Sequence, residues 1–104
     1  MRGRFAPTPS GRMHLGNVFA ALVAWLSVRA AGGEMVLRIE DLDRRAASRE
    51  RAELLMDDLR WLGLDWDEGP FWQSERGSAY DDAIERLAQA GLTYPCFCSR
   101  AELR

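Results

Sequence analysis

The change of hydrophobic period along the first 39 residues constrains the fold of this chain most strongly. Residues 3–6 (Gly-Arg-Phe-Ala) form a short strand-like run that the following proline ends, because proline cannot donate to a β-ladder. From Leu15 the apolar residues recur at steps of three and four, as in a helix, until the glycine pair 32–33. Residues 34–39 then alternate, which is typical of a strand. The sequence therefore predicts a βαβ unit with two parallel strands.

A second helix is expected to follow, with Ser48 as its N-cap residue and Gly63 at its end. Its spacing predicts a buried stripe of four residues: Ala52, Leu55, Leu59 and Leu62. Residues 63–73 contain two glycines, a proline and several aromatic side chains, and we expect them to form a loop with an aromatic cluster. The tryptophans of this region are interpreted as packing residues of the core and loop.

A third helix is predicted between the capping box of Ser78 and Asp81 and the glycine at position 91. One side of this helix is expected to carry four residues: Tyr80, Ala83, Ile84 and Leu87. Residues 92–98 are expected to be extended. Ser99 and Glu102 then form another capping box, which predicts the start of a further helix close to the last residue of the sequence. We expect the segment to be the N-terminal part of a longer catalytic domain, truncated within an insertion that begins at about residue 92.

Composition and charge narrow the functional classes. The chain of 104 residues is 47% hydrophobic and 29% charged, which is a globular composition. A net charge of −2 gives no global basic footprint, so a phosphate-bearing partner would need local basic groups. The chain opens directly into the first strand, and its longest apolar stretch, residues 18–26, is too short to span a membrane. We expect a cytoplasmic, monomeric protein without membrane contact and with reduced thiols.

The segment that joins the first strand to the first helix has the features of a nucleotide site. Ligands of open α/β sheets lie beyond the carboxyl ends of the strands, and a helix N-terminus favours anions. His14 can donate to a phosphate just before the helix, and Gly16 lets a flat base approach the backbone. A proline-rich turn with a surface histidine is the alternative. The chain has neither a G-x-G-x-x-G nor a G-x-x-x-x-G-K-[ST] pattern, which argues against a dinucleotide dehydrogenase or a P-loop NTPase.

Charged residues at the ends of the two predicted strands suggest an amino-acid site. Residues 37–43 (Leu-Arg-Ile-Glu-Asp-Leu-Asp) end the second strand with three carboxylates, and Arg4 lies in the first strand. Arginine forks onto a carboxylate and glutamate pairs with an ammonium, so Arg4 and Glu40 could together hold a zwitterionic amino acid. A solvated acidic loop and a divalent metal site are the alternatives.

Cys96 and Cys98 lie two residues apart on an extended segment, so their side chains point to the same face. Two thiolates could share a zinc ion, which needs four ligands or three plus water. The alternative is a pair of small buried hydrophobic side chains. His14 is the only histidine of the chain, and the first motif uses it, so the segment supplies at most two zinc ligands.

The string from Phe5 to Gly16, Phe-Ala-Pro-Thr-Pro-Ser-Gly-Arg-Met-His-Leu-Gly, resembles the HIGH signature of class I aminoacyl-tRNA synthetases in its glutamyl form. Residues 37–43 are similar to the Leu-Arg-Ile-Glu-Asp-x-Asp segment of the same family, and residues 94–99 resemble the start of its zinc site. The resemblance covers nearly the whole chain. It implies an α/β fold, the N-terminal half of a Rossmann-like class I synthetase domain with parallel strands and crossover helices.

The resemblance also implies roles for individual residues. His14 and Gly16 would act on ATP in catalysis, with Pro7 and Asn17 completing the ATP-binding motif. Arg4 would read the side-chain carboxylate of L-glutamate, and Glu40 would hold its α-amino group. The glutamate pocket would be lined by the segment from Arg4 to Thr8, which also contains Phe5, Ala6 and Pro7. Cys96 and Cys98 would begin a zinc site whose other ligands lie further along a longer chain.

Two types of glutamyl synthetase compete as the nearest resemblance. Residues 16–21 (Gly-Asn-Val-Phe-Ala-Ala) differ from the Gly-Gly-Ala-Arg-Thr-Ala of enzymes that charge tRNA(Glu), and residues 71–74 and Tyr80 look more like the glutamyl-Q type. That type activates glutamate with ATP without tRNA and transfers it to the queuosine base of tRNA(Asp). The family also uses a lysine-containing loop, and this chain has no lysine, so the segment alone is expected to be inactive. A non-catalytic nucleotide-binding remnant is the alternative from another class.

Overall fold

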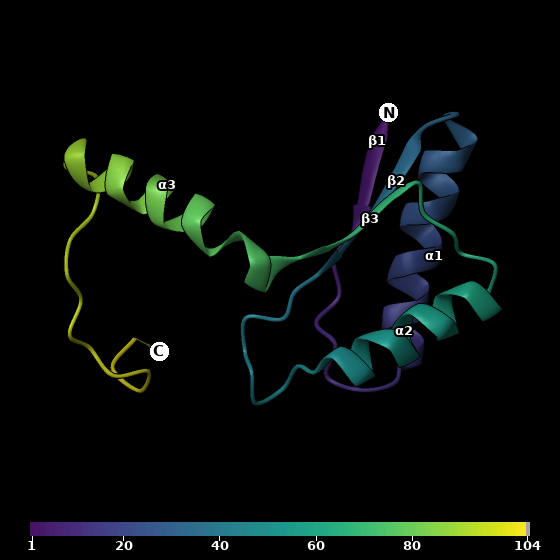
Figure 1. Ribbon diagram of the computed structural model, residues 1–104, viewed down its shortest axis with the longest axis horizontal. Coiled ribbons are helices and arrows are strands. Elements are labelled where there is room, and N and C mark those ends of the chain that lie inside the picture. Colours follow the sequence, from purple (N-terminus) through teal and green to yellow (C-terminus); the bar gives the residue numbers. More distant parts are fainter. Residues whose placement is uncertain (104) are drawn as a thin grey trace.

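A computed structural model describes residues 1–103 of the chain (Figure 1). Three parallel strands form one sheet in the order β1-β2-β3, and the helices alternate with them. The elements follow one another as β1 (Arg2–Phe5), α1 (Leu15–Ala30), β2 (Glu34–Ile39), α2 (Arg49–Trp61), β3 (Glu68–Trp72), the short 3-10 helix η1 (Gln73–Arg76) and α3 (Gly77–Gln89). The predicted βαβ unit is confirmed, with the first strand beginning and ending one residue earlier than expected.

The core lies between one face of the sheet and the two helices α1 and α2 (Figure 1). Met35, Leu37 and Ile39 alternate along β2 and are each at most 3% exposed. Leu37 and Ile39 pack in one cluster with side chains from α1, α2 and β3. Both helices therefore cover the same face, as right-handed crossovers between neighbouring parallel strands require. The opposite face carries the other residues of the alternation, among them Arg4 and Arg38.

The helix α2 follows the prediction closely. Ser48 is its N-cap, and the Ser48 Oγ accepts a hydrogen bond of 3.2 Å from the backbone N–H of Arg51. Three of the four predicted stripe residues are at most 2% exposed: Ala52, Leu55 and Leu59. Leu62 is the exception, because it caps the helix after Trp61 and is 39% exposed.

The prediction of a loop over residues 63–73 is wrong, because this segment contains the strand β3. Trp72 is buried beside Ile39 in the sheet, whereas Trp61 is 86% exposed. The sequence pattern did not predict this strand, because it contains a glycine and a proline. Gly69 is required there, because it has a φ of 104° and a Cβ at this position would lie 2.3 Å from the Leu37 carbonyl oxygen.

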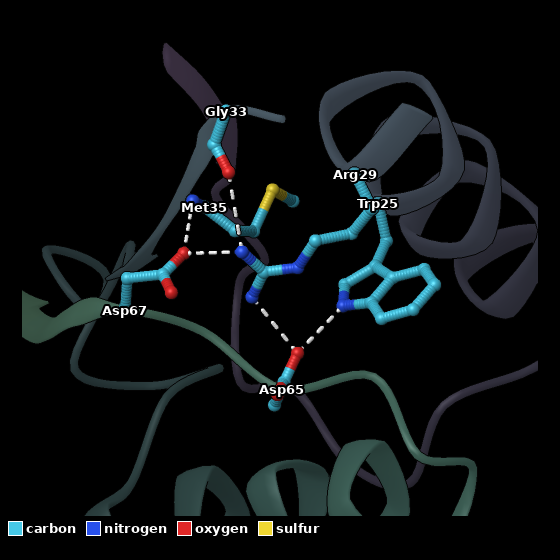
Figure 2. Close-up of polar contacts among 6 residues, drawn as sticks. All are labelled: Trp25, Arg29, Gly33, Met35, Asp65 and Asp67. Carbon is cyan, nitrogen blue, oxygen red and sulfur yellow. Dashed lines mark hydrogen bonds and ion pairs between the residues drawn. The ribbon is translucent and has the colours of Figure 1, made fainter. Parts of the chain in front are cut away.

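A polar cluster ties α1 to the amino ends of the strands (Figure 2). The guanidinium of Arg29 donates to Asp67 at 2.7 Å, to Asp65 at 2.9 Å and to the Gly33 carbonyl at 3.2 Å. Asp65 also accepts a 2.9 Å hydrogen bond from the indole N–H of Trp25, and Asp67 a 2.6 Å bond from the backbone N–H of Met35. These contacts join α1 to the start of β2 and to the loop before β3.

The helix α3 stands apart from the sheet, and none of its residues is buried (Figure 1). It begins at Gly77, so Ser78 lies inside the first turn and the predicted capping box with Asp81 is wrong. The predicted side of the helix is largely solvent-exposed, with Ile84 at 59% and Leu87 at 45%.

The C-terminal part of the described chain is irregular. Residues 92–98 belong to none of the strands. The Glu102 carboxylate accepts a 2.6 Å hydrogen bond from the Ser99 N–H, as a capping box requires, but residues 100–103 form turns and no helix. Among residues 1–103, no helix has the length and apolar character needed to cross a membrane.

Candidate active site

The carboxyl ends of β1 and β2 remain aligned beyond the last strand residues. The backbone N–H of Glu40 donates to the Pro7 carbonyl oxygen at 3.0 Å, which continues the parallel register beyond Phe5 and Leu37 and brings Thr8 level with Glu40. Along this segment Pro7 and Pro9 are buried on the helix side, whereas Arg4 and Thr8 are exposed. The alternation therefore places four predicted pocket residues on the uncovered face of the sheet: Arg4, Ala6, Thr8 and Glu40. Thr8 is level with Glu40, whereas Arg4 lies opposite Val36, earlier along the strands.

His14 is the N-cap residue of α1. Its backbone is extended, with φ −90° and ψ 170°, and its Nδ1 accepts a 3.1 Å hydrogen bond from the backbone N–H of Gly16. An accepting Nδ1 carries no proton, so the proton of the neutral imidazole lies on Nε2, which is free to donate. The first turn of α1 contains no acidic residue, so its N–H groups and dipole present positive charge to an incoming anion.

Gly16 lies close beneath the His14 ring. A Cβ at residue 16 would lie 3.1 Å from the His14 Cε1 and 3.2 Å from its Nδ1, which is tighter than ordinary contacts. A larger residue at position 16 would require the exposed His14 ring to shift by a few tenths of an ångström. The absence of a side chain at Gly16 thus leaves room for the His14 ring at its present position.

A cleft of about 310 Å³ lies beside this motif. It is lined by Phe5, Ala6, Pro7, Thr8, Ser10, Gly11, Arg12, Met13, His14, Asn17 and Leu55. The structure thus brings six predicted site residues together around one cavity, whereas Arg4, Gly16 and Glu40 do not line it. Thr8 joins the two groups, because it borders the cleft and is also aligned with Glu40 at the strand ends. The volume is at the lower end of the range for small-molecule sites.

The three carboxylates after β2 have separate partners. Glu40 accepts from the Arg38 Nη2 through its Oε1. Asp41 accepts from the Ser74 N–H at 2.9 Å and from its hydroxyl at 2.6 Å, and Asp43 accepts from the Arg45 N–H at 3.0 Å. Within residues 1–103, no three His, Cys, Asp or Glu side chains are grouped to hold a metal ion. The described residues therefore give no support to the alternative of a divalent metal site.

The bond between Asp41 and Ser74 links the loop after β2 to η1. Burial disfavours the charged form of Asp41, but the hydrogen bonds from the Ser74 hydroxyl and N–H outweigh burial and hold the pKa of this carboxyl below its usual value. Arg49 joins α2 to the same region, because its guanidinium lies 3.5 Å from the centre of the Trp72 ring and pairs with Glu75 of η1. The strand ends of β2 and β3 are thereby held in a fixed relation.

Cys96 and Cys98 are both exposed free thiols. Neither belongs to a group of three potential ligands within the described part of the chain. Two thiols do not meet the ligand count of a zinc ion, so residues 1–103 do not build such a site by themselves.

Sequence reasoning missed the partners of the acidic residues. Arg38 and Glu40 are two residues apart on a strand, so the period of two was sufficient to place them on one face. Ser74 could not be paired with Asp41 from the sequence, because the intervening strand β3 was not recognised. Arg12, which lines the cleft and lies 3.7 Å from Asp58, stood in the motif as a variable position.

The chain is similar in sequence and in fold to known aminoacyl-tRNA synthetases. The chain is 57% identical over 97% of its length to a glutamyl-Q tRNA(Asp) synthetase of Symbiobacterium thermophilum, of which it covers 34%. It is 46% identical over 99% of its length to a glutamate–tRNA ligase of Alkalilimnicola ehrlichii, of which it covers 22%. The crystal structure of a glutamate–tRNA synthetase from Elizabethkingia anophelis superposes with a TM-score of 0.82 at 36% identity, over 98% of this chain and 22% of that one.

The chain thus spans about a third or less of the length of these relatives. A profile described as tRNA synthetases class I (E and Q), catalytic domain, matches residues 1–104. With strands, helices and motif in the expected places, the chain belongs to the class I glutamyl and glutaminyl tRNA synthetases and carries sequence of their catalytic domain.

Proposed function

We propose that this chain is the N-terminal part of a cytoplasmic enzyme that activates L-glutamate with ATP in the absence of tRNA and transfers it to the queuosine base of tRNA(Asp). A protein of the relatives' length that carries residues 1–104 is the full-length enzyme. The single observation that carries the proposal is the arrangement at the carboxyl edge of the sheet. There the N-terminus of α1, capped by His14, shares a cleft with Thr8, the Glu40 N–H donates to the neighbouring Pro7 carbonyl, and Arg4 lies earlier, on β1, opposite Val36.

The proposed first step is attack of a glutamate α-carboxylate oxygen on the α-phosphorus of ATP. A new phosphorus–oxygen bond forms, the bond to pyrophosphate breaks, and glutamyl-adenylate results. No proton needs to leave the nucleophile, so positioning and charge stabilisation are the main contributions of the protein. The His14 Nε2–H would donate to a phosphate oxygen on which negative charge grows, next to the positive end of α1.

Glutamate would be held by groups that the described chain leaves without partners. Within residues 1–103, Arg4 has no ionic partner, although two other arginines of the same sheet face are paired. Its guanidinium suits the side-chain carboxylate of glutamate, in a bidentate geometry. The Glu40 Oε2 is available for the α-ammonium, because Arg38 occupies only Oε1.

The higher identity to the glutamyl-Q relative, 57% against 46%, favours queuosine of tRNA(Asp) as the acceptor. Residues 16–21 also favour the glutamyl-Q type, because they differ from the Gly-Gly-Ala-Arg-Thr-Ala of enzymes that charge tRNA(Glu). A glutamyl-tRNA synthetase acting on tRNA(Glu) is the second candidate, because the relative from Alkalilimnicola ehrlichii carries that name. Cys96 and Cys98 would contribute two zinc ligands, with the others supplied by the remainder of the full-length enzyme.

Two assays on the full-length enzyme test the proposal. Glutamate-dependent exchange of pyrophosphate into ATP is expected without any tRNA, and labelled glutamate is expected on queuosine-containing tRNA(Asp) and not on tRNA(Glu). Exchange that needs tRNA(Glu), with charging of that tRNA, would favour the second candidate. Nucleotide binding with no exchange under any condition would identify a non-catalytic remnant.

The 104-residue chain alone supplies a matched control. It carries the proposed glutamate residues and the histidine, but it lacks a lysine-containing loop and has no lysine. Its exchange rate is expected to be at background. A rate close to that of the full-length enzyme would contradict the division of labour proposed here.

A further inference from the structure

Arg38 contacts Glu40 of the proposed glutamate site but is not itself one of the proposed glutamate-binding residues. It is in β2, opposite Phe71 of β3, on the uncovered face of the sheet. Ile39, between Arg38 and Glu40, is fully buried and anchors the strand from the other face. The backbone thus fixes where the side chains of Arg38 and Glu40 begin, and both must extend over the same surface.

The Arg38 guanidinium has one partner in the described chain, and that partner is Glu40. The Arg38 Nη2 donates to the Glu40 Oε1, and the two side chains are 28% and 33% exposed. The Arg38 Nε is buried and has no hydrogen-bond partner in residues 1–103. The bond to Glu40 is therefore the one polar contact in residues 1–103 that holds this guanidinium.

The pair also leaves half of the Glu40 carboxylate unused. Oε1 is held by Arg38, whereas Oε2 accepts from no group in the described chain. A carboxylate fixed through one oxygen points its other oxygen in a defined direction, and a free glutamate side chain does not. Holding Glu40 in one rotamer would remove an entropy cost that substrate binding otherwise has to meet.

We propose that Arg38 is a positioning residue for the α-ammonium site: it orients Glu40 so that the second carboxylate oxygen faces the amino group of the substrate. The inference rests on the proposed function, since it assumes that Glu40 binds glutamate. Arg38 itself does not touch the substrate. Its effect is expected on glutamate binding and not on ATP, because the cleft near His14 is lined by other residues.

The test uses the full-length enzyme and steady-state pyrophosphate exchange with glutamate and ATP varied separately. Arg38→Met is expected to raise the KM for glutamate about tenfold or more, the effect of one lost charge-assisted contact, with the KM for ATP unchanged. Arg38→Lys keeps the charge without the planar fork and is expected to recover part of the loss. Arg2→Met is the matched control, because Arg2 is also paired across this sheet face, with Glu68 at the amino end.

A double variant separates positioning from a general structural role. If Arg38 acts only through Glu40, Arg38→Met is expected to add almost nothing to the glutamate KM of Glu40→Gln. Additive effects, or equal changes in the KM for ATP and for glutamate, would overturn the inference in favour of a structural role. An unchanged glutamate KM in Arg38→Met would overturn it outright.

The proposed function has its own outcome in the same experiment. If Glu40→Gln alone leaves the glutamate KM unchanged, the assignment of the ammonium site to Glu40 fails and the inference on Arg38 fails with it. If Glu40→Gln raises the KM and Arg38→Met does not, only the inference on Arg38 is lost. Should Arg38→Met fail to fold, the glutamate KM of Arg38→Lys decides, with a value equal to that of the unaltered enzyme counting against the proposal.

Discussion

The two ends of the same three-stranded sheet use their polar side chains in opposite ways. At the amino end, Arg29 is shared between two aspartates and a backbone carbonyl, and each of those aspartates has a second donor from elsewhere in the chain (Figure 2). At the carboxyl end, Arg4 has no ionic partner in residues 1–103 and the His14 Nε2 remains free to donate. Under the proposed function, the groups left open at the carboxyl end are the ones that bind substrate, whereas those at the amino end serve the fold.

The largest expected effect comes from the histidine, and it separates capping from catalysis. In His14→Asn the side-chain oxygen can still accept from the helix N–H groups, because asparagine is a good N-cap residue, but the imidazole donor is gone. The pyrophosphate exchange rate of the full-length enzyme is expected to fall about 100-fold or more. Its thermal unfolding midpoint is expected to stay the same.

His14→Ala is the matched variant, because it loses both the donor and the cap. Its exchange rate is expected to equal that of His14→Asn, while its unfolding free energy falls by about 1 kcal/mol. An exchange rate that survives in His14→Asn and is lost only in His14→Ala would show that the histidine serves the helix and not the reaction.

The next effect concerns the open arginine. Arg4→Gln keeps a polar side chain of similar reach but removes the charge that would read the glutamate side chain. The glutamate KM in pyrophosphate exchange is expected to rise about tenfold or more, and the ATP KM is expected to stay constant. Arg2→Gln, two residues earlier on the same strand face, should leave both constants unchanged. Equal effects of the two substitutions would argue for a general charge effect.

At the other end of the sheet, substitution is expected to act on stability instead. Arg29→Met leaves Asp65 and Asp67 close together without the cation that joins them. Circular dichroism of the full-length enzyme should show a lower unfolding midpoint, with both KM values unchanged at a temperature where the variant is folded. A raised glutamate KM in the folded variant would remove the distinction between the two ends.

The smallest expected effect is a dependence on pH. Hydrogen bonds from the Trp25 indole N–H and from Arg29 hold the pKa of Asp65 below its usual value, and the Met35 N–H and Arg29 do the same for Asp67. A lowered native pKa means that the unfolded state binds more protons in this range. The stabilisation is thus complete above the ordinary aspartate pKa of about 3.9 and is lost as the pH falls through the native values.

Unfolding midpoints measured between about pH 5 and pH 3 test this linkage. The double variant Asp65→Asn/Asp67→Asn is expected to show a shallower decline over this range than the unaltered enzyme. Asp82→Asn, on the exposed helix α3, is the control and should decline in parallel with the unaltered enzyme. Parallel curves for all three proteins would show that the cluster does not contribute through its charges.

The sequence predicted those parts of the fold that depend on local periodicity. The alternation of Met35, Leu37 and Ile39 was sufficient to predict β2 and its buried face, and the spacing around Ser48 predicted the start of α2. The strand β3 was not predicted, because Gly69 and Pro70 disfavour a strand locally. Its extended conformation is supported by pairing with the neighbouring strand β2.

In the candidate site, too, local features were predictable and contacts between distant residues were not. A motif contiguous in the sequence predicted which residues would surround the helix N-terminus. The hydrogen bond of Asp41 with Ser74 joins residues 33 positions apart across the unrecognised strand, so no local pattern could predict it. The bond between His14 and Gly16 depends on the capping conformation of the backbone, which the sequence alone did not specify.

The central claim, that the open carboxyl end binds glutamate and the closed amino end does not, can be tested by one measurement on both regions. The Nε–Hε resonances of Arg4 and Arg29, assigned through Arg4→Lys and Arg29→Lys, are followed in the full-length enzyme as glutamate is added. The account predicts that the Arg4 signal shifts in a saturable manner and that the Arg29 signal does not move. Saturable movement of Arg29 with a stationary Arg4 would contradict it.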